Sequence, residues 1–138
     1  RSISDIFYPR IKKELPRGYA IIDMLKNKMI GTVDFHSKIK NQRVAEIGYA
    51  MHKDYWHKGI MTQAVHELIL LGFNYLGYEK ITICHLSYNI GSKRVIEKNG
   101  FKLIRKKIYT LKKRNETISG DMLIYELTKE DYYASKQS

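Results

Sequence analysis

One segment with the period of a helix lies between segments with the two-residue period of strands, and this arrangement constrains the fold most. Apolar residues fall at positions 61, 64, 65, 68, 71 and 75 or 76, so they form one stripe along a helix from Gly59 to Leu76. Gly77 follows, and glycine readily adopts the left-handed conformation that ends a helix. We therefore predict a long helix whose apolar stripe packs against a sheet.

Three runs typical of β-strands precede this helix. The first two, 18–25 and 29–36, flank a short turn centred on Asn27 and predict a hairpin, since asparagine tolerates turn geometry. The third run covers 44–51. Its alternation places Glu46 on the face opposite the odd-numbered apolar residues.

The second half of the chain alternates strand, helix and strands. Residues 80–87 are apolar on both faces, which is typical of a strand buried between layers. Residues 89–99 predict a short helix with Asn89 as its N-cap and Gly100 as its stop. Two final strands are predicted at 101–111 and 118–128, joined by a basic turn at 112–116. The order ββ-β-α-β-α-ββ indicates an α/β (α+β) fold, in which helices flank a mixed sheet.

Composition narrows the class of protein. The 138 residues, 43% hydrophobic and 28% charged, suit one folded domain, and no apolar run reaches the roughly 18 residues that span a bilayer. We therefore expect no membrane partner. The single cysteine, Cys84, cannot form an internal disulfide, which favours a reducing cytoplasm. The net charge of +11 favours polyanionic partners such as nucleic acid, nucleotide phosphates or acidic proteins.

The segment from Tyr55 to Thr62 lies between the third strand and the long helix. A glycine-bearing loop there aims backbone N–H groups outward at the positive end of the helix dipole, which suits phosphate oxygens. Lys58 adds a mobile positive charge. The segment is neither a P-loop nor a dinucleotide fingerprint, and a plain connecting loop remains the alternative.

Three motifs in sequence carry a family resemblance. They are AEIGY (45–49), YWHKGIMTQAV (55–65) and NxxSxxVxEKxGF (89–101), followed by the ending DMLIYELTKEDY (121–132). Together they resemble the GNAT superfamily of acetyl-CoA-dependent N-acetyltransferases. Specifically, the chain is similar to the Rim-type branch, which acetylates the α-amino group of ribosomal proteins.

This resemblance implies a fold and an activity. The fold is a twisted, mostly antiparallel sheet with a splayed parallel strand pair and flanking helices. The activity is direct transfer of acetyl from acetyl-CoA to a primary amine, with a protein N-terminus as the preferred acceptor. We expect residues 1–138 to form a single domain that lacks the family's N-terminal strand and first helix. A sheet edge left open in this way would favour a homodimer.

The resemblance also assigns binding roles. The backbone amides of the loop hold the CoA pyrophosphate, and Gly59 matches the family pattern strictly. Asn89 corresponds to the asparagine that binds the pantetheine arm, and Ser92 to a small residue close to the CoA sulfur. The implied cofactor-binding residues are Tyr49, Ala50, Met51, Trp56, His57, Lys58, Gly59, Ile60, Met61, Thr62, Asn89 and Ser92.

Proton transfer needs a base and a donor to the leaving thiolate. A carboxylate within an apolar strand destabilises the fold unless it is solvated, forms an ion pair or has a catalytic role. Glu46 is therefore the candidate base. A salt bridge to one of the lysines is its alternative. The position at which the superfamily often carries an acidic tyrosine is Ile96 here, which leaves Ser92, or water that it orients, as the donor.

Other chemistries are less favoured. The five histidines lack HExxH spacing, and with one cysteine we expect no metal site. Cys84 lies within a predicted buried strand, so we expect a packed thiol and no covalent enzyme intermediate.

Alternative functions remain open. A basic RNA- or ribosome-binding module is one, supported by the charge and by basic clusters near the C-terminus; an inactive acetyltransferase scaffold is another. In the basic cluster at 102–107, the two-residue alternation of a strand predicts that Lys102 and Lys106 lie on one side. It places Arg105 and Lys107 on the other side. Among acetyltransferases, lysine, polyamine and aminoglycoside acceptors are alternatives. A basic surface repels polycations, however, which favours a protein amino group.

Overall fold

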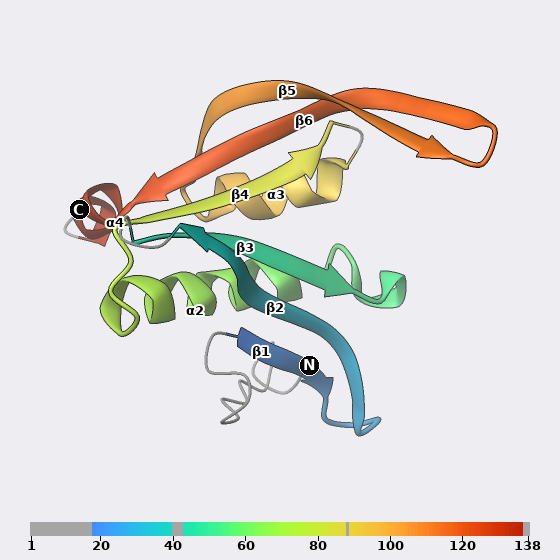
Figure 1. The fold of residues 1–138 in the computed structure, drawn as a ribbon. Helices are drawn as coiled ribbons and strands as arrows, with labels where there is room; N and C mark the ends of the chain where they lie inside the picture. The colour runs from blue at the N-terminus through green and yellow to red at the C-terminus, as the bar shows by residue number, and fades with distance from the viewer. Residues whose placement is uncertain (1–17, 40–42, 88, 137–138) are drawn as a thin grey trace.

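The computed structural model describes residues 18–39, 43–87 and 89–136. The elements follow in the order β1 (Gly18–Asp23), β2 (Lys28–Ile39), β3 (Val44–Met51), the single 3₁₀ turn η1 (Lys53–Tyr55), α2 (Ile60–Asn74), β4 (Lys80–Leu86), α3 (Ile90–Lys98), β5 (Lys102–Lys113), β6 (Glu116–Thr128) and α4 (Lys129–Lys136). The predicted order of strands and helices is therefore confirmed, with α4 in addition (Figure 1).

Within the described residues, six strands form one sheet in the order β1-β2-β3-β4-β6-β5. Neighbouring strands are antiparallel except β3 and β4, which are parallel. The β3–β4 ladder runs only from Val44–Lys80 to Glu46–Thr82, although both strands continue beyond it. The two strands therefore diverge towards their carboxyl ends, as Figure 1 shows, and the expected splayed parallel pair is confirmed.

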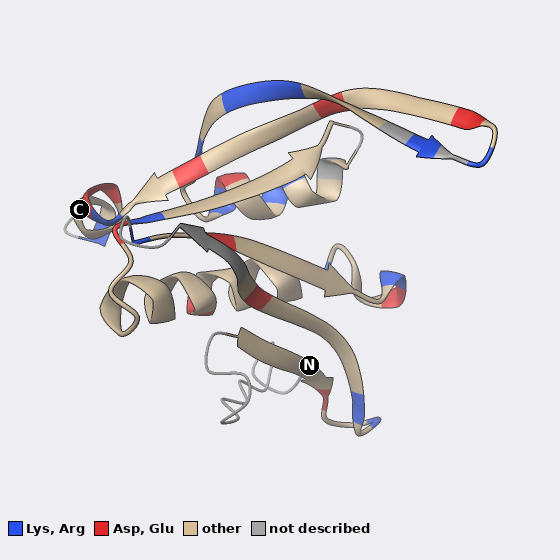
Figure 2. Ribbon diagram, viewed as in Figure 1, with Lys and Arg blue, Asp and Glu red and all other residues tan. Residues whose placement is uncertain are grey.

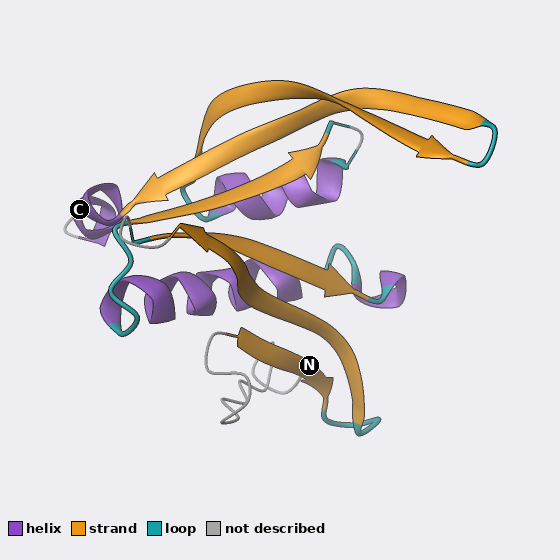
Figure 3. Cartoon of the chain, in the orientation of Figure 1, coloured by secondary structure: helices purple, strands orange, loops and turns teal. Residues whose placement is uncertain are grey.

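Helices α2 and α3 cover one face of the sheet and contact each other (Figure 3). The apolar stripe of α2 is buried against β1, β2 and the facing side chains of β4. Helix α4 joins this layer, because the Tyr132 ring lies 5.0 Å from that of Phe73. Burial of each large apolar side chain contributes about 1.5–3 kcal/mol, so this layer is the main source of stability.

Local residue preferences predict several turns and helix ends correctly. Asn27 adopts a positive φ of 50° in the β1–β2 turn, and Gly77 and Gly100 adopt positive φ after α2 and α3. Asn89 caps α3 by accepting a hydrogen bond from the Ser92 backbone N–H at 3.1 Å.

Strand β4 differs from the prediction. Burial alternates along it, and Ile81 and Ile83 face the helices while Thr82 and Cys84 are half-buried on the other face. The expectation of a strand covered on both faces is therefore wrong within the described residues. Hydrophobic residues on both faces do not reveal whether a second layer covers them.

The last hairpin is longer than predicted and projects from the sheet. The β4–β6 ladder runs only from Met122 to Thr128, so the segments 108–113 and 116–121 form ladder pairs with each other and not with β4 (Figure 1). We call these two segments the arm. Its turn contains Arg114 at a φ of 56°.

A bulge changes which basic side chains share a face. The β5–β6 register shifts between Leu103 and Arg105. Lys102 therefore lies on the same face as Arg105, and Lys106 lies on the other, where it pairs with Asp121 at 4.0 Å. The predicted grouping of Lys102 with Lys106 is wrong, because one inserted residue reverses the alternation.

The expectation that the family's first strand and helix are missing concerns the segment before Tyr19. Residues 1–17 lie outside the described residues, so that expectation stays a prediction. Among the helices that the structure describes, none is long and apolar enough to cross a membrane.

Candidate functional site

Glu46 is the last residue of β3 that pairs with β4 before the two strands diverge. Its side chain lies on the sheet face opposite α2 and α3, where the Cys84 thiol of β4 is 4.0 Å from Glu46 Oε2. Burial raises the pKa of Cys84, and the nearby Glu46 carboxylate raises it further. A raised pKa leaves less thiolate at neutral pH, so the Cys84 thiol is a weaker nucleophile there.

Tyr49 reaches across the divergence on the helical face. Its hydroxyl donates to Ser92 Oγ at the start of α3 over 2.6 Å, although the two residues are 43 positions apart. Ser92 is only 9% exposed. Burial is the largest effect on Tyr49 and raises its pKa, whereas the Ser92 hydrogen bond lowers it and Cys84 raises it.

The N-terminus of α2 has the features of an anion-binding site. Its N-cap, Gly59, has a φ of 77°, no side chain among the described residues caps the helix, and its first turn contains no acidic residue. Ile60 and Met61 are buried in the core, so only their backbone can face a ligand. The exposed backbone N–H groups of such a helix end bind phosphate oxygens well.

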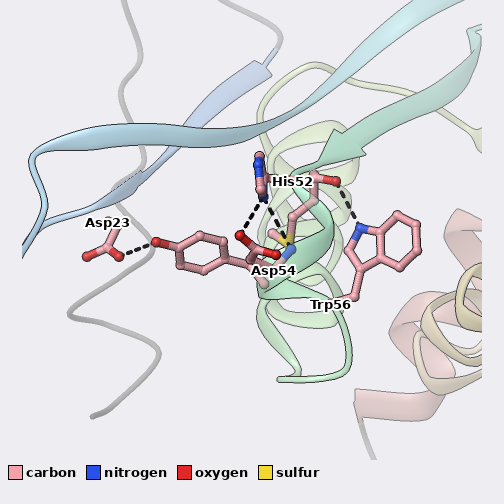
Figure 4. A network of polar contacts seen from close by, with 6 residues as sticks. Asp23, His52, Asp54 and Trp56 are labelled. Atoms are coloured by element: carbon pink, nitrogen blue, oxygen red, sulfur yellow. Dashed lines mark hydrogen bonds and ion pairs between the residues drawn. The ribbon is translucent and has the colours of Figure 1, made fainter.

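The loop before α2 is held by polar contacts (Figure 4). The Trp56 indole N–H donates to the Met51 carbonyl at 2.9 Å, and His52 Nδ1 accepts from the Asp54 backbone N–H at 3.2 Å. Trp56 itself is 56% exposed, so its ring remains available at the surface.

A buried aspartate anchors this loop to the β1–β2 turn. Asp23 is 0% exposed and accepts from the Tyr55 hydroxyl at 2.5 Å and from the Leu25 and Lys26 backbone N–H groups at 3.1 and 3.3 Å. Sequence reasoning missed this pair. The only signal was a lone carboxylate ending an apolar strand, directly before a turn.

The loop and α3 lie beside each other. A Cβ atom placed on Gly91 would lie 3.8 Å from Asn89 Oδ1 and 4.0 Å from His57 Cε1. His57, Lys58 and Asn89 are exposed, and the Thr62 carbonyl accepts from Asn99 Nδ2 at 3.2 Å. Both loop motifs thus border one surface.

The structure gathers the predicted site residues into two groups. On the helical side are Tyr49, Met51, Trp56, His57, Lys58, Gly59, Ile60, Met61, Thr62, Asn89 and Ser92. Glu46 lies on the opposite face, and Ala50 is exposed on that face near the end of β3. Ile96 is 0% exposed in the core, so this position holds no acid. Among the described residues, no three His, Cys, Asp or Glu side chains gather as metal ligands would.

Known proteins resemble this chain over most of its length. Residues 2–102 match the family described as Acetyltransferase (GNAT) domain. A Bacillus subtilis (strain 168) protein named "Putative ribosomal N-acetyltransferase YdaF" is 30% identical over 106 residues, 72% of this chain and 58% of that protein. Ribosomal-protein-S5-alanine acetyltransferase from Vibrio fischeri shares the fold with a TM-score of 0.75 at 22% identity, over 88% of this chain and 67% of that chain.

A chimera of the spermidine N-acetyltransferase SpeG from Vibrio cholerae and hSSAT also shares the fold. Its TM-score is 0.73 at 17% identity, over 85% of this chain and 69% of that chain. The chain spans about half the length of the curated relatives it matches. The family match includes all three motifs, and the resemblance inferred from them is confirmed: the chain belongs to the GNAT acetyltransferase family.

Proposed function

We propose that the chain transfers an acetyl group from acetyl-CoA directly to a primary amine, with a protein N-terminal α-amino group as the preferred acceptor. The observation that carries the proposal is the divergence of β3 and β4 beyond Glu46 and Thr82. Beyond this point the β4-facing backbone of β3 has no ladder partner on β4, so its N–H groups can bind an extended substrate and polarise a carbonyl.

Donor and acceptor approach this opening from opposite faces. The loop at Gly59 and the α3 N-terminus at Asn89 and Ser92 bind the pyrophosphate, the pantetheine arm and the sulfur on the helical face. Glu46, on the other face, accepts the proton that the amine loses, directly or through water. The amine nitrogen attacks the thioester carbon, the C–S bond breaks, and Ser92 donates a hydrogen bond to the departing thiolate.

The acceptor preference rests on charge and on relatives. A net charge of +11 disfavours polycationic acceptors and favours docking on an acidic protein. The YdaF match supports a ribosomal protein, whereas the SpeG chimera, at 17% identity, supports the fold alone. A reaction with spermidine faster than with an alanine-starting peptide would assign the polyamine alternative.

The first test is isothermal titration calorimetry with acetyl-CoA, beside ATP and a short RNA as polyanion controls. We expect saturable binding of acetyl-CoA and weaker binding of ATP. Asn89→Asp keeps the capping oxygen but removes the side-chain N–H donors, so acetyl-CoA affinity should fall about tenfold. Asn74→Ala, at the far end of α2, is the matched control and should leave affinity unchanged.

One observation favours a second candidate, a polyanion-binding module. Figure 2 shows basic residues gathered along β5 and at the turn of the arm. Arg105, Lys107, Lys112 and Arg114 are exposed there. Binding of the RNA equal to or stronger than that of acetyl-CoA, with no selectivity for acetyl-CoA, would assign this function in place of acetyl transfer.

A further inference from the structure

We infer that Tyr49 positions the Ser92 hydroxyl towards the departing sulfur. The inference rests on the proposed acetyl transfer and concerns a residue that the family resemblance implied only as cofactor-binding. The observation is the 2.6 Å hydrogen bond from the Tyr49 hydroxyl to Ser92 Oγ, across the divergence of β3 and β4.

The direction of this hydrogen bond follows from acidity. A phenol, with an ordinary pKa near 10, is a far stronger acid than a serine hydroxyl, so Tyr49 donates and Ser92 accepts. A serine hydroxyl has one proton and two acceptor lone pairs. Because the Tyr49 hydroxyl donates to one lone pair of Ser92 Oγ, the Ser92 proton points away from Tyr49. Accepting this hydrogen bond also polarises the Ser92 O–H bond.

The surroundings fix Ser92 in this role. Its backbone N–H is held by Asn89 Oδ1 at 3.1 Å, and its side chain is nearly fully buried. Helix α3, nine residues long, has no acidic residue in its first turn, so the positive end of its dipole favours negative charge on a nearby sulfur. Ile96, at the family's usual tyrosine position, is buried in the core. A tyrosine hydroxyl thus reaches α3 from β3 instead.

The proton balance needs no transfer from Tyr49. Glu46 takes the proton from the amine, the electron pair of the C–S bond goes to sulfur, and the Ser92 O–H stabilises the thiolate by a hydrogen bond. The phenol keeps its proton throughout, which agrees with the burial that raises the pKa of Tyr49. Tyr49 is therefore a positioning residue that acts through Ser92.

A double-mutant cycle tests this role. Turnover of Tyr49→Phe, Ser92→Ala and the double variant is measured with an alanine-starting peptide and with spermidine. The CoA formed is quantified by chromatography, so that Cys84 does not interfere. We expect Ser92→Ala to lower kcat about 100-fold and Tyr49→Phe about tenfold, with the Kd for acetyl-CoA changed less than about twofold. The double variant should equal Ser92→Ala.

Controls separate a positioning role from a structural one. Tyr125→Phe removes the hydroxyl of another buried tyrosine, which lies 3.3 Å from His85 Nε2, and should keep the wild-type kcat. Urea unfolding checks that each variant folds. In Ser92→Thr, which keeps a hydroxyl, Tyr49→Phe should lower kcat again.

The outcomes are distinguishable. A wild-type protein that neither binds acetyl-CoA nor forms CoA with an amine would overturn the proposed function. An active wild type in which Tyr49→Phe lowers kcat equally with and without Ser92 would overturn only the role of Tyr49. If Tyr49→Phe weakened only the affinity for acetyl-CoA and left kcat unchanged, the positioning role of Tyr49 would also be overturned.

Discussion

Glu46 and Cys84 form a pair whose contact can be tested without knowing the acceptor. The carboxylate disfavours a nearby thiolate and so raises the pKa of Cys84, in addition to the larger effect of burial. Glu46→Gln removes this negative charge, so the pKa of Cys84 falls and more thiolate is present at neutral pH. We expect alkylation by iodoacetamide to become about two- to fivefold faster. Glu79→Gln, an exposed carboxylate paired with Arg43, is the control and should leave the rate unchanged.

The same substitution tests the proposed base. Glutamine cannot accept the amine proton, so kcat should fall about 100-fold while acetyl-CoA affinity stays the same. Full turnover in Glu46→Gln, together with faster alkylation of Cys84, would place the carboxylate correctly and yet remove it from the chemistry.

Residues governed by local rules could be predicted, whereas residues that meet through the fold could not. Asn27, Asn89 and Gly100 follow from turn and capping preferences that act within a few positions. The hydrogen bond between Tyr49 and Ser92 spans 43 positions and depends on how far β3 and β4 diverge. No local pattern encodes that divergence, so the sequence alone did not link the side chain of Tyr49 to Ser92.

At the scale of secondary-structure elements, the prediction errors concern where strands and helices begin and end, and one inserted residue in β5. The predicted turn at 112–116 was too wide, because the arm pairs its basic residues as strand up to Lys113. Helix α4 was not predicted, although Thr128 Oγ1 accepts from the Asp131 backbone N–H at 3.1 Å in a recognisable N-cap pattern. The bulge between Leu103 and Arg105 cannot be predicted from the residue types of this strand.

The link between η1 and the β1–β2 turn predicts an effect on both stability and binding. Tyr55→Phe removes the hydroxyl that donates to buried Asp23, so the carboxylate loses a donor that water cannot readily replace. We expect the free energy of unfolding in urea to fall by about 1–3 kcal/mol. Acetyl-CoA affinity should fall as well, because Tyr55 directly precedes the loop that enters α2.

A matched tyrosine provides the control for this effect. The Tyr78 hydroxyl is buried without a hydrogen-bond partner among the described residues. Tyr78→Phe should therefore leave the free energy of unfolding unchanged or raise it. Equal destabilisation by Tyr78→Phe and Tyr55→Phe would show that the Asp23 contact contributes nothing specific.

At the scale of the whole molecule, the net charge of +11 and the exposed apolar residues on the edge strand β5 have opposite effects on self-association. Among the described strands, β5 is the outermost on its side, and Ile108 on the arm is 81% exposed. Exposed apolar residues on an edge strand favour pairing between copies, whereas like charges repel them. The charge repulsion is screened by salt and the apolar attraction is not.

Self-association should therefore increase as salt rises from about 0.05 to 0.5 M, measured by light scattering after size exclusion. Ile108→Lys should reduce this association with little change in stability, because the side chain is already exposed. Leu25→Lys adds the same charge at another exposed aliphatic residue, in the β1–β2 turn, and should have a smaller effect. Association that weakens with salt would instead indicate ion pairs between copies, and a monomer at every salt concentration would mean that the exposed apolar residues of β5 do not drive association.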